Sequence, residues 1–151
     1  MRLRYYRRLW RRDDGQALAE FALILPILFF LIAGIIEFGR GWNIKQAVTD
    51  ASREGARWTV VQDNSISCPA GVIDKVKQRL ALANLDTTAA KTTVTVTPSA
   101  SCRGTAGYAA GVDMTVNVTT KYKMGFLGAL LSWTVGASTI TIGSQTTMRN
   151  E

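Results

Sequence analysis

The feature that most constrains this chain is an uncharged apolar segment close to its N-terminus. Residues 21–36 carry no charge, and the stretch widens to 17–38 when Glu20 and Glu37 near its ends are included. As a helix rising about 1.5 Å per residue, the wider stretch would reach about 33 Å, against a bilayer hydrocarbon core of about 30 Å. The apolar run at 126–131 is too short to cross. The sequence therefore predicts one membrane-spanning helix.

The charges on either side of this segment predict its orientation. The segment after it mixes basic with acidic residues, whereas the segment before it is rich in arginine: Arg2, Arg4, Arg7, Arg8, Arg11 and Arg12. Because basic residues remain on the cytoplasmic side, we expect the N-terminus in the cytoplasm and the C-terminal part exported. A cleaved secretory signal is the alternative. No small-x-small cleavage site follows Ile36, since the chain continues Glu37-Phe38-Gly39-Arg40-Gly41-Trp42, so we favour a permanent anchor.

The two cysteines of the chain, Cys68 and Cys102, both lie in the part predicted to be exported. An oxidising compartment favours a disulfide between them, and closing a loop of about 35 residues would stabilise the fold by about 3–4 kcal/mol. The alternative is two buried free thiols. Two cysteines this far apart, in a chain without histidine, make a poor metal site, so we expect no bound metal.

The lack of histidine also bears on catalysis. It removes the commonest general base and the Ser-His and Cys-His nucleophile pairs. The sequence contains no Gly-rich phosphate loop. Lys121-Tyr122-Lys123 places two cations around an aromatic ring, but its alternation favours a solvated strand face over a nucleic-acid contact. We therefore expect no catalytic residues, no cofactor and no nucleic-acid partner.

The exported part changes its hydrophobic period along the chain. Residues 42–61 form an amphipathic stripe that continues from the apolar segment, and a second helix is expected after Cys68-Pro69, ending near 84–86. Its stripe consists of Val72, Val76, Leu80 and Ala83. Beyond Lys91 the period becomes two, which predicts strands, with a loop at 98–111. This order predicts an α+β fold with a small antiparallel sheet packed against helices.

The junction Gly15-Gln16-Ala17-Leu18-Ala19-Glu20-Phe21 resembles the processing site of type IV prepilins, with a basic leader before the glycine and an apolar helix after it. The surrounding sequence resembles the TadE family of pilin-like proteins from tight-adherence (Flp-type) pilus systems. The matching stretches are Glu20-Phe21-Ala22-Leu23-Ile24-Leu25-Pro26, Ile36-Glu37-Phe38-Gly39-Arg40 and Ala51-Ser52-Arg53-Glu54-Gly55-Ala56-Arg57. The resemblance is good over residues 15–61 and loose beyond them.

The resemblance implies cleavage between Gly15 and Gln16 by a prepilin peptidase, leaving Glu20 to neutralise a new α-amino group. The alternative is that Glu20 lies at headgroup level and is only hydrated. We thus expect three parts: a cytoplasmic leader (1–15), a transmembrane helix (16–41) and an exported α+β domain (42–151). The family-motif positions are Glu37, Phe38, Gly39, Arg40, Arg53, Glu54, Gly55 and Arg57.

The resemblance further implies a minor pilin or pseudopilin that assembles with other pilin subunits and an inner-membrane platform. Its expected location is the bacterial inner membrane, with the C-terminal domain in the periplasm, in a pilus or at the cell surface. The competing hypothesis is an unprocessed membrane-anchored binding or adhesion module. N-terminal sequencing separates the two hypotheses, since a start at Gln16 would support the first.

Overall fold

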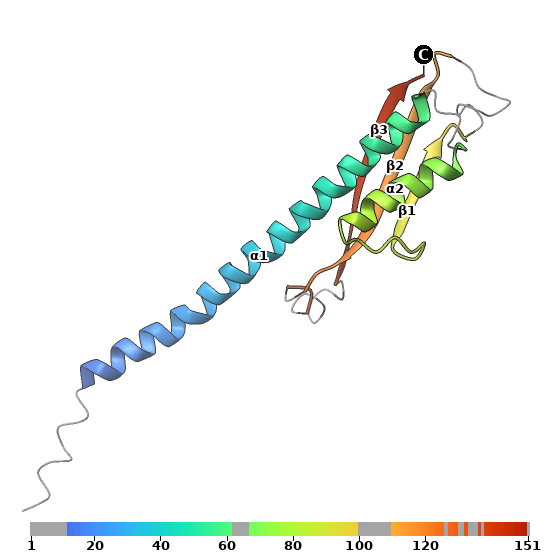
Figure 1. The fold of residues 1–151 in the computed structure, drawn as a ribbon. Helices are drawn as coiled ribbons and strands as arrows, with labels where there is room; N and C mark the ends of the chain where they lie inside the picture. Colours follow the sequence, from blue (N-terminus) through green and yellow to red (C-terminus); the bar gives the residue numbers. More distant parts are fainter. Residues whose placement is uncertain are drawn as a thin grey trace, which may run out of the picture.

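The protein folds into one long helix that carries a small α+β head at its C-terminal half (Figure 1). The computed structural model describes residues 12–61, 67–99, 110–125, 127–129, 132, 136 and 138–150, with side chains from 15 onward. The elements are α1 (Arg12–Val60), α2 (Ala70–Leu82), β1 (Thr92–Thr97), β2 (Asp113–Lys123) and β3 (Thr139–Arg149).

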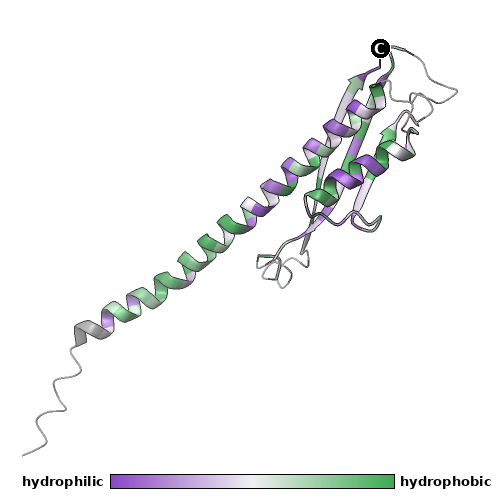
Figure 2. Cartoon of the chain, in the orientation of Figure 1, coloured by the Kyte–Doolittle hydropathy of each residue, from purple (hydrophilic) through white to green (hydrophobic). Residues whose placement is uncertain are grey.

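Helix α1 is continuous over 49 residues. At about 1.5 Å per residue it is about 74 Å long, more than twice the thickness of a hydrocarbon core. Its N-terminal half is apolar and stands clear of the head, and its C-terminal half alternates polar and apolar residues (Figure 2). Neither Pro26 nor the glycines at 39 and 41 interrupt it. The boundary predicted at residue 41 therefore lies within one helix, and residues 12–15 of the predicted leader form its first turn.

The three strands form an antiparallel sheet in the order β1-β2-β3. Val94 pairs with Val118 and Val96 with Val116, so the valines of β1 and β2 share one face. In β1 buried and exposed residues alternate strictly, as expected for a strand with one face on a core. Helices α1 and α2 cover this face: α1 lies over β2 and β3, and α2 lies beside α1 over β1 (Figure 1).

The hydrophobic core lies between the two helices and the sheet. It consists of Val48, Ala51 and Ala56 from α1, Val72, Val76 and Leu80 from α2, and Val94, Val96, Met114, Val116 and Val118 from the sheet. The α1 contribution is made of small side chains, so this helix approaches its neighbours closely. A Cβ atom on Gly55 would lie 2.6 Å from Val76 Cγ2 and 3.1 Å from Val116 Cγ1.

The α+β prediction is confirmed, including the order of helices before strands. One detail is wrong: Ala83 was predicted on the buried stripe of the second helix, but α2 ends at Leu82 and Ala83 is exposed. The chain turns there because Asn84 adopts a positive φ of 58°, a conformation that asparagine tolerates better than most residues. Most of the loop predicted at 98–111 lies outside the described residues.

Candidate functional site

The predicted cleavage junction lies on the first turns of α1. A Cβ atom on Gly15 would meet no atom within 4 Å, so the space that a side chain would enter here is open. Glu20 lies one turn beyond Gln16, and the Gln16 Nε2 donates a hydrogen bond to Glu20 Oε1 at 2.9 Å. Both side chains are exposed. Among the residues that the structure describes, Glu20 therefore has a local hydrogen bond at the surface of α1.

The apolar half of α1 exposes nearly all of its large side chains. They include Leu18, Phe21, Leu23, Ile24, Ile27, Leu28, Phe29, Leu31, Ile35 and Ile36. Within the described part of the chain, α1 contains the one segment that is long and apolar enough to cross a membrane. A helix that is apolar all round is stable when lipid or other apolar surfaces surround it, so this half has the length and composition of a membrane anchor.

The second carboxylate of the apolar segment, Glu37, is only 6% exposed and has partners in the sheet. Its Oε1 accepts hydrogen bonds from the Tyr122 hydroxyl at 2.6 Å and from the Gly125 backbone N–H at 2.8 Å. Tyr122 lies near the end of β2, and Gly125 lies just beyond it. These bonds satisfy a buried charge and attach the end of β2 to α1 where the apolar segment ends.

Arg40 completes this junction one turn further along α1. A Cβ atom on Gly125 would lie 3.2 Å from Glu37 Oε2 and 3.8 Å from a terminal nitrogen of Arg40, so glycine allows this close approach. Burial raises the pKa of the Tyr122 hydroxyl, and its hydrogen bond to Glu37 raises it further, whereas the charge of Arg40 acts in the opposite direction. Tyr122 is thus a neutral donor at neutral pH, as the bond to Glu37 requires.

A groove of about 710 Å³ lies between α1 and the sheet at this level. Gly34, Phe38, Gly41 and Trp42 line its α1 side, on one stripe of the helix. The opposite wall includes Tyr122, Met124, Leu127, Ile140 and Ile142. The motif residue Gly39 does not line the groove, and a Cβ atom on it would meet no atom within 4 Å.

Higher on α1, two side chains make polar contacts with β3. The Ser52 Oγ lies 2.8 Å from Thr146 Oγ1 and 3.2 Å from Ser144 Oγ, and Ser52 itself is buried. The Lys45 Nζ donates to the backbone carbonyl of Gly143. Together with Glu37, these residues attach α1 to the sheet at three levels along its C-terminal half.

The motif at 53–57 combines packing with an exposed polar surface. Gly55 lies at the closest approach of α1 to α2 and β2, whereas Arg53 and Arg57 are exposed. Glu54 accepts a hydrogen bond from Trp58 Nε1 at 2.8 Å, and the Lys75 Nζ lies 6.0 Å from the centroid of that indole. The motif therefore holds α1 against α2 and presents two arginines to solvent.

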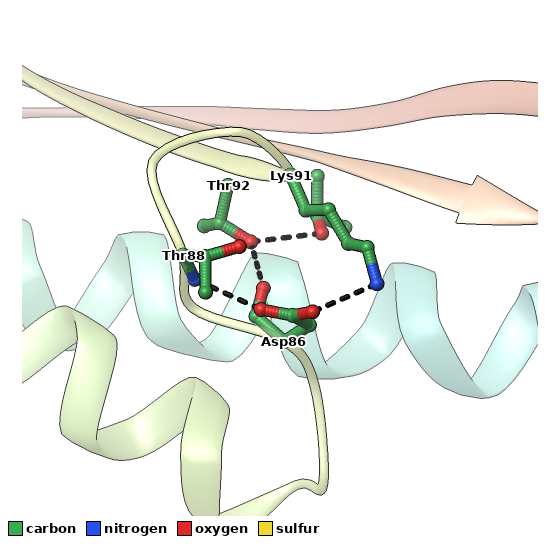
Figure 3. Close-up of polar contacts among 5 residues, drawn as sticks. Asp86, Thr88, Lys91 and Thr92 are labelled. Carbon is green, nitrogen blue, oxygen red and sulfur yellow. Dashed lines mark hydrogen bonds and ion pairs between the residues drawn. The ribbon is translucent and has the colours of Figure 1, made fainter.

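Two further features stabilise the segments around α2. Cys68 is disulfide-bonded; its predicted partner, Cys102, lies outside the described residues, so this pairing stays a prediction. In the turn before β1, Asp86 accepts a hydrogen bond from the Thr88 N–H at 3.0 Å and forms an ion pair with Lys91 at 2.8 Å (Figure 3). Thr92 Oγ1 donates a hydrogen bond to the Asp86 carbonyl at 2.5 Å (Figure 3). It also lies 3.0 Å from Thr120 Oγ1.

Sequence reasoning identified Glu37 and Arg40 as motif positions but missed their partners. Tyr122 was grouped with two lysines on a solvated face, whereas the structure turns the tyrosine toward α1 and leaves Lys121 and Lys123 exposed. The sequence did contain a signal for this arrangement. Successive side chains of a strand point to opposite faces, so Tyr122 cannot share a face with Lys121 and Lys123. Ser52 and Lys45 carried no comparable signal.

A known protein family matches one segment of this chain. No curated protein and no solved structure matches the chain. Among the residues that the structure describes, no group of three or more potential ligands could hold a metal ion. A family model, described as TadE-like protein, matches residues 15–57, which comprise the predicted junction, the anchor, the Glu37 site and the motif that packs at Gly55. This segment, from Gly15 to Arg57, is therefore TadE-like, as its motifs predicted.

Proposed function

We propose that this protein is a minor pilin or pseudopilin that takes part in assembling a Tad/Flp-type pilus or a related secretion apparatus. The TadE-like match supports an association with Tad pili. The observation that carries the finer proposal is the continuity of α1, whose exposed apolar half runs without a break into the half that packs against the head. The proposed role is structural and non-enzymatic.

An uninterrupted helix suits a subunit that leaves the bilayer as one body. The Glu37, Lys45 and Ser52 contacts are all made within the chain, so they do not depend on lipid. The apolar half, in contrast, makes few contacts with the rest of the chain and needs an apolar environment from outside. Lipid supplies it before assembly, and helices of neighbouring pilin subunits supply it in the filament.

The proposal assigns Glu20 to this exchange. Cleavage after Gly15 would place the new α-amino group on Gln16, one turn from the Glu20 carboxylate, since residues four apart on a helix are neighbours. Glu20 is exposed, so it could equally pair with the amine of a neighbouring subunit. Either pairing offsets the cost of holding an ammonium group in a low-dielectric setting.

The proposed partners follow from this assignment: a prepilin peptidase, other pilin or pseudopilin subunits and an inner-membrane assembly platform. The proposed orientation has the N-terminus in the cytoplasm and the head in the periplasm. The arginines that support it lie at residues 2–12, and the mixed charges follow the anchor.

The test begins with the mass of the protein extracted from membranes of its native host. We expect a chain that starts at Gln16. We expect Gly15→Val to retain the leader, because valine lacks the compact size and permissive backbone of the glycine at the cleaved bond. Gly39→Val, at an equally open glycine of the same helix, should be processed normally. A parent protein that keeps its leader would contradict the pilin proposal and favour an unprocessed anchored module.

The second arm tests assembly. Glu20→Gln removes the carboxylate charge and should leave membrane abundance unchanged, while co-purification with other pilin subunits is lost. Glu54→Gln is the matched control, since Glu54 lies on the same helix outside the apolar segment and bonds locally to Trp58. If Glu20→Gln co-purifies like the parent, the carboxylate has no role in assembly.

A further inference from the structure

The groove between α1 and the sheet lies where the membrane anchor ends. Along α1 it extends from Gly34 to Lys45, which corresponds to about 17 Å of helix. The apolar segment ends at Phe38, in the middle of this range. With α1 in a membrane, the Gly34 end of the groove therefore opens at the level of the lipid tails, and the Lys45 end at the level of the headgroups.

The chemistry of the groove changes in the same direction. Phe38 and Trp42, 72% and 58% exposed, stack with their ring centroids 6.3 Å apart at its rim. Ile140 is 40% exposed on the opposite rim. A tryptophan beside apolar side chains is typical of the boundary between hydrocarbon and headgroups. The groove is thus an apolar surface that continues directly from the anchor.

A basic group lies at the headgroup end. Lys45 lines the groove, and only one of the three donors of its ammonium group is needed for its bond to the Gly143 carbonyl. Glu37 also lines the groove, and Arg40, which does not line it, lies near the Glu37 carboxylate. The charge of Arg40 offsets that of Glu37, so the positive charge of Lys45 is left to complement the single negative charge of a phosphodiester.

We propose that this groove binds one phospholipid of the bilayer that holds α1, with an acyl chain between Phe38, Trp42 and Ile140 and the phosphate at Lys45. The inference rests on the membrane anchoring in the proposed function and adds a ligand to it. A helix from a second subunit is the competing occupant, and the experiment below distinguishes the two by the mass of the adduct.

The experiment uses the full chain reconstituted in vesicles of phosphatidylcholine and phosphatidylglycerol, with a benzophenone amino acid in place of Ile140. After irradiation, we expect intact-mass spectrometry to show an adduct of one phospholipid. The same probe in place of Gln145, an exposed residue higher on β3, measures background labelling. An adduct with a second copy of the chain, or labelling no greater than at Gln145, would overturn the lipid site.

Two glycine variants on α1 test whether the groove itself is responsible. Gly41→Leu places a side chain in the groove, whereas Gly39→Leu adds the same side chain outside it, and neither new Cβ atom meets anything within 4 Å. We expect Gly41→Leu to reduce the lipid adduct to background and Gly39→Leu to retain it. Equal loss in both variants, or none in either, would overturn the proposal.

Vesicle flotation separates this inference from the anchoring on which it rests. A parent protein that floats with the vesicles but gives no lipid adduct contradicts the groove site alone. A parent protein that fails to float contradicts both the lipid site and the membrane anchoring of α1.

Discussion

Gly55 is the position where the packing of α1 can be tested most directly. Replacing it with alanine would place a Cβ atom 2.6 Å from Val76 Cγ2, about 1 Å inside normal carbon–carbon contact. Val76 and Val116 are both fully buried, and valine has little rotamer freedom, so neither can move aside easily. Overpacking of this kind costs about 1–3 kcal/mol, while alanine regains about 1 kcal/mol of helix propensity.

Because the contact is severe, we place the cost near the top of that range, and we expect Gly55→Ala to destabilise the head by about 2 kcal/mol. Thermal unfolding of the full chain in detergent, followed by circular dichroism, should show a midpoint lower by about 10 °C. Gly39→Ala is the control, since no neighbour opposes its gain in helix propensity. Adding Val76→Ala should relieve the clash, so the double variant should lose less stability than the two single losses combined. If Gly55→Ala raises the midpoint as Gly39→Ala does, the close approach at Gly55 is wrong.

Three further predictions concern the contacts that hold the head together. Tyr122→Phe should lower the stability of the head by about 2 kcal/mol, because it removes a hydrogen bond to a buried carboxylate. A double-mutant cycle with Glu37→Gln should show coupling between the two residues, and additive losses of stability would contradict the hydrogen bond. Hydrogen bonds from Lys91 and Thr88 lower the pKa of Asp86 from 3.8 to about 2. The Asp86 carboxylate therefore contributes fully to the stability of the fold above its unfolded-state pKa, and this contribution is lost as the pH falls toward 2. Carboxyl NMR should give this low pKa directly, and a value near 3.8 would refute the ion pair. Replacing Cys68 and Cys102 together with serine should cost about 3–4 kcal/mol, with reductant producing the same shift in the parent; two alkylatable thiols in unreduced protein would exclude the bridge.

The elements that the sequence predicted well are those in which a local period records burial. Val48, Ala51 and Gly55 recur at helical spacing, and all three are buried against the head. The alternating valines of β1, Val94 and Val96, likewise face the core. In a helix or a strand, the backbone geometry fixes the direction in which each side chain points. The spacing of residues in the sequence therefore determines which of them share a face.

The candidate site was harder to predict because its partners are distant in the chain. Glu37 and Tyr122 are 85 residues apart, and Ser52 and Thr146 are 94 apart. These contacts depend on the register of β2 and β3 and on the angle at which α1 crosses them, which no local pattern contains. The TadE-like motif identified Glu37 as a position of interest without indicating that its role is to accept two hydrogen bonds from the sheet.

The two carboxylates that bracket the apolar segment therefore have different physical roles. Glu37 is buried, and its partners Tyr122 and Gly125 belong to the same chain, so its charge stays satisfied whatever surrounds α1. Glu20 is exposed and accepts a hydrogen bond from the side chain of Gln16, a bond it can exchange for a stronger one with an ammonium group. A subunit that moves from lipid into a filament needs both kinds of carboxylate: one that keeps the head fixed to the helix, and one that changes partners. Under the proposed function, substitutions at Glu37 should thus reduce the stability of the isolated protein, whereas substitutions at Glu20 should affect assembly alone.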